Sequence, residues 1–125
     1  MEYTLPDDAE SARWARRLTT AFLTDRRAPA GAREQLDDAR LIVSELVANA
    51  AEHGHSACRL RLRVDQGELT VEVQDDSPLP PRTGKLSLWA ESGRGLAMVR
   101  LLASRFAVTG DRDGGKTVRA VLAVC

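Results

Sequence analysis

The sequence predicts an α+β protein built as a two-layer α/β sandwich, in which about three helices cover one face of a mixed, mostly antiparallel sheet. Two observations lead to this prediction. Segments with a helical period of apolar residues are followed by segments in which apolar and polar residues alternate. The resulting order is β-α-α-β-β-loop-α-β-β. The 125 residues contain no internal repeat, so a single domain over residues 1–125 is expected.

The N-terminal part predicts a short edge strand and two helices. Residues 2–6 alternate weakly, and apolar residues then recur at helical spacing over residues 8–25, with Trp14 expected in the core. Pro29 and Gly31 break this pattern. A second helix is expected over residues 32–53. Its apolar face comprises Leu36, Ala39, Ile42, Val43, Leu46, Val47 and Ala50.

The C-terminal part predicts two hairpins separated by a long loop and a helix. In the first hairpin, apolar residues alternate with arginines before the Gln66-Gly67 turn and continue to alternate after it. The loop is rich in proline and glycine, and loops of this length are usually functional. The expected bounds are 58–64 and 69–73 for the first hairpin, 77–92 for the loop, and 106–109 and 117–124 for the second hairpin. Between the loop and the second hairpin lies a helix with inward residues from Leu96 onward.

The overall charge favours neither nucleic acid nor a membrane as the partner. Lys plus Arg (18) balances Asp plus Glu (18), so the chain has no field of one sign. The apolar runs are too short to cross a bilayer. The first residues show no basic region followed by an apolar one, so a cytoplasmic location is expected. The two cysteines lack the spacing of metal ligands.

A polar stripe interrupts the second helix within the segment SELVANAAEHG. Glu45 and Asn49 are four residues apart and therefore share one face, which continues to Glu52 and His53. A carboxamide oxygen is a suitable ligand for Mg²⁺, and a carboxylate one turn away could accept a proton. The alternative is a solvated seam on an amphipathic helix.

Two further segments could bind parts of a nucleotide. Asp75 ends a strand, where its carboxylate could accept from an exocyclic amino group such as that of adenine; the alternative is an ordinary turn aspartate. Gly93, Arg94 and Gly95 open a helix at Leu96, where free amides and the helix dipole favour phosphate. The alternative is a flexible joint between loop and helix.

The segment Gly114-Gly115-Lys116-Thr117 is not a Walker phosphate loop. It lacks the earlier glycine of that motif, and it leads into a strand where the motif requires a helix. On its residues alone, this segment predicts a hairpin turn followed by a strand.

In their order along the chain, these motifs resemble the GHKL ATPase superfamily. The closest likeness is to its anti-sigma-factor serine/threonine kinase branch, the RsbW and SpoIIAB type. The segments that carry the resemblance are LIVSELVANAAEHG, VEVQDDSPLPP, ESGRGLAMVRLLASRFAV and GGKTVRAVL, and together it spans essentially the whole chain. The resemblance implies the histidine kinase/gyrase-type ATPase fold and a Bergerat-type site for ATP and Mg²⁺.

The resemblance also implies roles for individual residues. Glu45 would be the general base, Asn49 would bind Mg²⁺ through its side-chain oxygen, and Asp75 would bind the adenine amino group. Residues 77–92 would form the ATP lid. The other implied nucleotide contacts are His53, Gly93, Arg94, Gly95 and Leu96 near the phosphates, and Thr117 in the water network beside adenine.

Glu45 distinguishes two branches of the superfamily. Sensor histidine kinases usually carry Asn at this position, and their imidazole acceptor needs less help from a base. A hydroxyl acceptor benefits from a positioned carboxylate. The resemblance therefore implies phosphorylation of serine or threonine, or ATP hydrolysis. It also implies a sigma factor and an anti-sigma antagonist as partners, with a homodimer as a possible assembly.

One motif departs from the superfamily pattern. The usual Asp-x-Gly-x-Gly reads Asp75-Asp76-Ser77-Pro78-Leu79, so both glycines are absent. Three functions remain open at this point. The first is a Mg-ATP-dependent protein kinase, and the second is a non-catalytic module that sequesters a partner with or without nucleotide. The third is a plain interaction domain whose polar stripe is only solvated.

Overall fold

The computed structural model describes residues 1–6, 10–53, 57–76, 93–112 and 114–124, with backbone alone for 51–53 and 93–96. Five strands form one sheet in the order β1-β2-β3-β5-β4. The strands are β1 (Glu2–Leu5), β2 (Cys58–Asp65), β3 (Glu68–Asp75), β4 (Arg105–Gly110) and β5 (Lys116–Ala123). All four neighbouring pairs are antiparallel, so the expectation of a mixed sheet is corrected to an antiparallel one.

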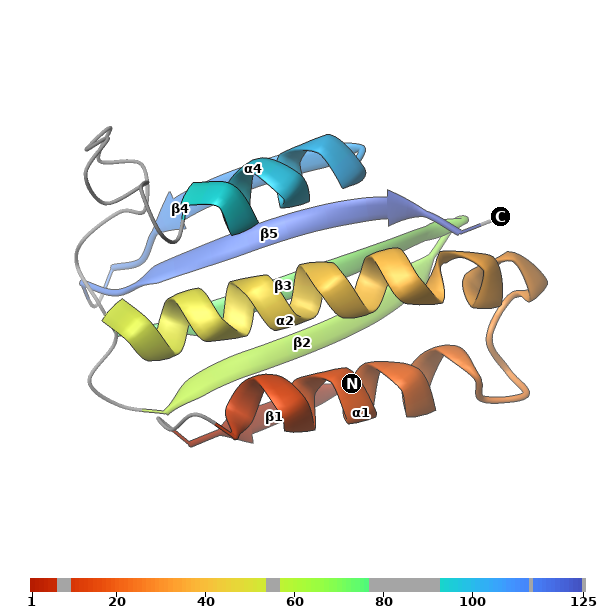
Figure 1. The fold of residues 1–125 in the computed structure, drawn as a ribbon, viewed down its shortest axis with the longest axis horizontal. Helices are drawn as coiled ribbons and strands as arrows, with labels where there is room; N and C mark the ends of the chain where they lie inside the picture. Colours follow the sequence, from red (N-terminus) through yellow and green to blue (C-terminus); the bar gives the residue numbers. More distant parts are fainter. Residues whose placement is uncertain (7–9, 54–56, 77–92, 113, 125) are drawn as a thin grey trace.

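Three α-helices of the described chain cover one face of this sheet, which confirms the predicted two-layer sandwich (Figure 1). They are α1 (Ser11–Leu23), α2 (Leu36–His53) and α4 (Gly93–Leu102). The expected second helix begins as a separate 3₁₀ segment, η1 (Ala30–Gln35), before α2. Among the described helices, none has the length and apolar character needed to span a membrane.

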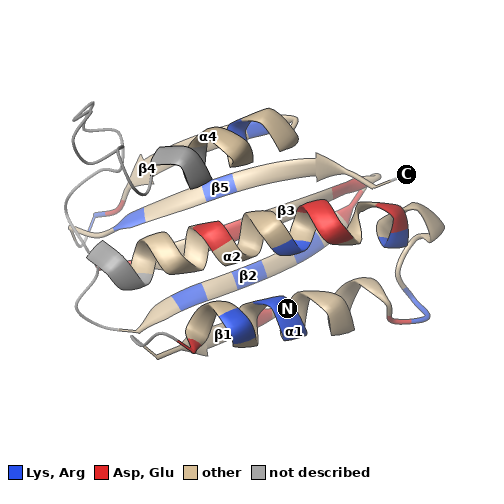
Figure 2. Ribbon diagram, viewed as in Figure 1, with Lys and Arg blue, Asp and Glu red and all other residues tan. Residues whose placement is uncertain are grey.

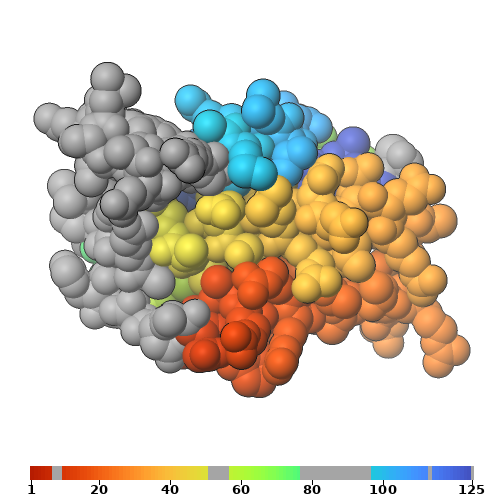
Figure 3. All heavy atoms as spheres, viewed as in Figure 1, coloured from red at the N-terminus to blue at the C-terminus, as the bar shows by residue number. Residues whose placement is uncertain are grey.

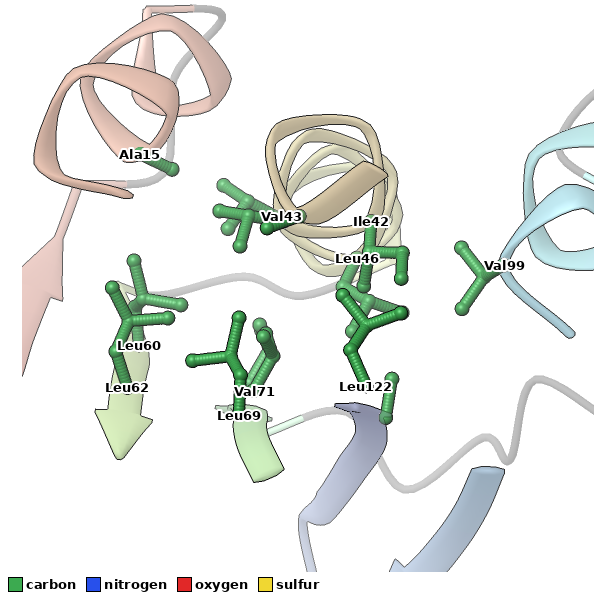
Figure 4. Close-up of a cluster of buried hydrophobic side chains, with 14 of the residues drawn as sticks. Ala15, Ile42, Val43, Leu46, Leu60, Leu62, Leu69, Val71, Val99 and Leu122 are labelled. Carbon is green, nitrogen blue, oxygen red and sulfur yellow. The ribbon is translucent and has the colours of Figure 1, made fainter. Parts of the chain in front are cut away.

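The core lies between α2 and the middle strands. In Figure 4, Ile42 and Leu46 of α2 point toward Val99 of α4 and Leu122 of β5, while Val43 points toward α1. Alternate residues of each strand face this layer, as the period of a strand requires. In the space-filling view, α2 lies between α1 and α4 (Figure 3). The central helix α2 therefore packs against α1 on one flank and against α4 on the other.

The face of the sheet that the described helices leave uncovered is charged. Arg59, Arg61 and Arg63 of β2 are exposed and alternate with buried residues. Arg59 and Arg61 lie 3.0 and 3.4 Å from the Glu2 carboxylate. Figure 2 shows both basic and acidic residues along the described helices and strands. This face is therefore solvated, and exposed pairs of this kind contribute little to stability.

Trp14 is not a core residue, contrary to the prediction from helical spacing. Its side chain is 51% exposed, and the Arg17 guanidinium lies 5.4 Å from its ring centroid. The buried line of α1 runs through Ala15, Thr19 and Leu23, which are spaced by one helical turn. Trp14 is about 100° away from this line around the helix, so it faces solvent.

Candidate functional site

Four element ends meet at one end of the sandwich. The C-terminal end of α2, the end of β3, the beginning of α4 and the beginning of β5 lie on the same side of the molecule (Figure 1). The β3–β5 register places Asp75 opposite Lys116, at the last pair of the ladder. The predicted polar residues of α2, β3 and α4 therefore come from elements that converge.

Asp75 forms a buried ion pair with Lys116. The Lys116 Nζ lies 2.9 Å from each of the two carboxylate oxygens of Asp75. The side chains are 3% exposed for Lys116 and 2% for Asp75. Both face the helices because they share the inward period of their strands, which continues through Val73 on β3 and Val118 on β5. Asp75 is therefore a paired interior residue in this structure.

Thr117 lies on the opposite face of the sheet from Asp75. Its hydroxyl donates to the Asp111 carboxylate, at 3.1 and 3.3 Å from the two oxygens. The Gln74 amide donates to the same carboxylate at 3.0 Å. A shift of one residue along a strand reverses the face of the side chain. The structure thus places Lys116 beside Asp75, whereas Thr117, expected in the water network beside adenine, faces the other side of the sheet.

Sequence reasoning missed Lys116, although the chain carries a signal for it. Val118, Ala120 and Leu122 alternate as the buried positions of β5. Extending this alternation backward by one step places Lys116 on the buried face. A lysine at a buried strand position needs a partner of opposite charge, and Asp75 is opposite it in the register.

Glu45 and Asn49 lie one turn apart in α2, Glu45 in the middle of the helix and Asn49 one turn before its C-terminal end, and their exposure differs. Asn49 is buried, with 5% of its surface exposed, whereas Glu45 is half-buried. Helical geometry places both on the flank of α2 that contains Ile42, and Figure 4 shows this flank facing Val99 of α4. A solvated seam therefore does not describe Asn49.

The remaining predicted residues are placed only by their backbone. His53 ends α2, and Gly93 begins α4, which confirms that the Gly-x-Gly segment opens a helix. Arg94, Gly95 and Leu96 occupy the first turn of α4. The side chains of these residues and the predicted lid at 77–92 lie outside the described part of the structure.

Gly115 packs directly against the backbone of Asp75. A Cβ atom built on Gly115 would lie 2.3 Å from the Asp75 carbonyl oxygen and 3.2 Å from the Asp76 Cα. Both contacts involve backbone, so neither can be relieved by a side-chain rotation. Glycine at this position therefore brings the two strands together beside the ion pair.

Replacing Gly115 with alanine is expected to lower the free energy of unfolding by about 1–3 kcal/mol, because the strand ends must separate to admit the methyl group. Gly110→Ala is the matched control, since its added Cβ would meet nothing within 4 Å. Urea denaturation of both variants measures the difference. Equal stability of the two variants would contradict the close packing at Asp75.

The sandwich and its polar end define the class as a single-sheet α+β domain with a candidate nucleotide site at the helix and strand ends. The sequence model of one protein family, the histidine kinase-like ATPase domain, matches residues 5–122. The chain therefore belongs to this family. A chain in the crystal structure of the SiaB-SiaC complex from Pseudomonas aeruginosa is similar, with a TM-score of 0.67 and 15% identity. The similarity covers 98% of this chain and 89% of that chain, and at this identity it shows the fold. No curated protein matches the sequence.

Family membership implies that the domain binds ATP, usually with Mg²⁺. The end of the site near Asn49 and the end near Asp75 fit this ligand differently. The Asn49 side-chain oxygen is a hard ligand, which suits a Mg²⁺ ion that is also held by phosphate and water. The described residues contain no group of three His, Cys, Asp or Glu that could hold a metal by itself. At the other end, Asp75 is bound by Lys116 and is not exposed to an adenine amino group.

Proposed function

We propose that this protein is a regulator that uses Mg-ATP to phosphorylate a serine or threonine of a partner protein. The partner is an anti-sigma antagonist, and the regulator also binds a sigma factor. The observation that supports this proposal best is the placement of Asn49 and Glu45. A buried carboxamide and a half-buried carboxylate lie one turn apart on α2, on the flank of the helix that contains Ile42.

In this proposal Glu45 is the general base. The serine oxygen forms a bond to the γ-phosphorus, the bond to the β–γ bridging oxygen breaks, and ADP leaves. The hydroxyl proton passes to the Glu45 carboxylate. Asn49 would hold Mg²⁺ through its side-chain oxygen, and the ion would offset the negative charge of the phosphates.

The protein-partner component has separate support. The similar chain comes from a complex of two proteins, SiaB and SiaC, and its fold corresponds to nearly all of this chain. The balanced charge of 18 basic and 18 acidic residues also suits a protein partner better than nucleic acid. We include a homodimer among the assemblies to be measured, by light scattering with and without nucleotide.

The proposal predicts Mg²⁺-dependent transfer of label from [γ-³²P]ATP to a recombinant anti-sigma antagonist. We expect the label on serine or threonine, and we expect chelation of Mg²⁺ or the Asn49→Ala substitution to remove it. Gln74→Ala is the control, because it deletes a carboxamide from the opposite face of the sheet. Equal labelling by the Asn49→Ala variant and the parent would contradict the role of Asn49 in binding Mg²⁺.

The Asp75–Lys116 pair favours a second function, a module that sequesters its partner without phosphorylating it. In this case a purified sigma factor binds the parent and the Asn49→Ala variant with the same affinity, and added ATP leaves that affinity unchanged. A sigma factor whose affinity depends on Mg-ATP would contradict this second function.

A further inference from the structure

Asp75 already binds an N–H donor of this chain at the place where the proposed nucleotide site needs an acceptor for adenine. The Lys116 Nζ lies 2.9 Å from both carboxylate oxygens, so it bridges them on the edge that they share. The exocyclic amino group of adenine is also an N–H donor, and it competes for the same acceptor. The ammonium has the advantage, because its positive charge adds a Coulomb attraction to the hydrogen bond, whereas the adenine amino group is neutral.

The surroundings of the pair oppose its opening. Lys116 and Asp75 are 3% and 2% exposed, and the inward neighbours Val73 and Val118 are buried and apolar. Gly115, which has no side chain, allows its backbone to lie close to the Asp75 carbonyl, where an added Cβ would be 2.3 Å from the oxygen. Because the Asp75 side chain is 2% exposed, an adenine amino group could reach it only after the side chains around the pair had rearranged. That exchange replaces a charged donor with a neutral one in a buried place, which is unfavourable.

We propose that Lys116 determines the base specificity of this site by holding Asp75 and preventing it from recognising the adenine amino group. The ligand class is then a purine nucleoside triphosphate with Mg²⁺, recognised through its phosphates near Asn49. The site does not distinguish an amino group from a carbonyl group at purine C6. This inference rests on the proposed function for the nucleotide itself, but the role of Lys116 has its own test.

The test compares Mg-ATP with Mg-ITP, in which a carbonyl replaces the amino group, by isothermal titration calorimetry on the full chain. We expect the wild-type protein to bind both with Kd values within about twofold of each other, since no hydrogen bond at C6 is lost. The Lys116→Ala variant is expected to favour ATP by about tenfold or more, the effect of one hydrogen bond to a charged acceptor. Arg119→Ala is the control, because it removes an exposed cation from the same strand.

The outcomes separate this inference from the proposed function. A wild-type preference for ATP of tenfold or more overturns the role of Lys116 and leaves the kinase proposal standing. A second outcome is that only the Lys116→Ala variant binds nucleotide and that it prefers ATP. Lys116 would then close the site in the wild-type protein, and the kinase proposal would fail for the natural chain. The inference is overturned if neither protein binds a nucleotide. It is also overturned if the ratio of the Kd values for ATP and ITP is the same in both proteins.

A folding control accompanies the Lys116→Ala variant, because the substitution leaves a buried carboxylate without its cation. Circular dichroism establishes whether the variant is folded. If it is unfolded, Lys116→Met takes its place, since methionine keeps much of the side-chain volume but removes the charge and the donor. The ratio of the Kd values for ATP and ITP on the wild-type protein needs no variant, and this ratio can overturn the inference by itself.

Discussion

Replacing Lys116 with alanine is expected to lower the free energy of unfolding by about 3–5 kcal/mol. The substitution leaves the Asp75 carboxylate, which is 2% exposed, in an interior that no longer supplies its cation. Native domains are stable by only about 5–15 kcal/mol, so this loss is a large part of the total. Asp75→Ala should cost a similar amount, because it leaves the Lys116 ammonium without its carboxylate.

The exposed pair between Arg105 and Glu68 is a matched control. Its N–O distance is 2.8 Å, close to the 2.9 Å of the buried pair, but its side chains are 66% and 39% exposed. We expect Arg105→Ala to lower the free energy of unfolding by less than about 1 kcal/mol, since water screens the pair. The comparison therefore isolates burial, and not distance, as the cause of the larger effect.

Urea denaturation measures these differences as shifts of the midpoint at constant slope. The double variant Asp75→Val/Lys116→Met is expected to recover most of the loss, because replacing both charges of a buried pair with apolar groups is often neutral. A loss below about 1 kcal/mol in both single variants would show that neither charge depends on its partner.

The sequence was sufficient to predict the layers of the fold. The helical period in α2 and the alternation in β2 and β3 are strong because each element has one buried face. The same reasoning failed for Trp14, since helical spacing identifies a set of apolar residues but not the direction that the helix presents to the sheet. That direction depends on tertiary packing, which buries the line through Ala15 instead.

The candidate site was predicted less completely than the fold. Glu45, Asn49 and Asp75 come from elements that do converge, but their sequence spacing gave no information about burial. Whether a stripe residue such as Asn49 is buried depends on tertiary packing, which the spacing within one helix does not reveal. The partner of Asp75 required the register between β3 and β5, and a displacement of one residue separates Lys116 from Thr117.

Under the proposed kinase function, Glu45→Gln is expected to lower the rate of phosphoryl transfer by about 10²–10⁴-fold, the usual contribution of a positioned general base. Glutamine keeps the shape of the side chain but cannot accept the hydroxyl proton. Asp37→Asn is the matched control, because it removes one carboxylate from an exposed position in the first turn of the same helix. Its rate should equal that of the parent.

The division of the effect between kcat and KM identifies the role of Glu45. A base acts in the transition state, so kcat and kcat/KM should fall together while the affinity for Mg-ATP stays within about twofold. Single-turnover transfer of label to the acceptor, with nucleotide affinity measured separately by calorimetry, supplies both quantities. A variant with unchanged kcat and weaker Mg-ATP binding would assign Glu45 to the metal together with Asn49. The proton of the acceptor hydroxyl would then pass to another group, because a carboxylate coordinated to Mg²⁺ is a poor base.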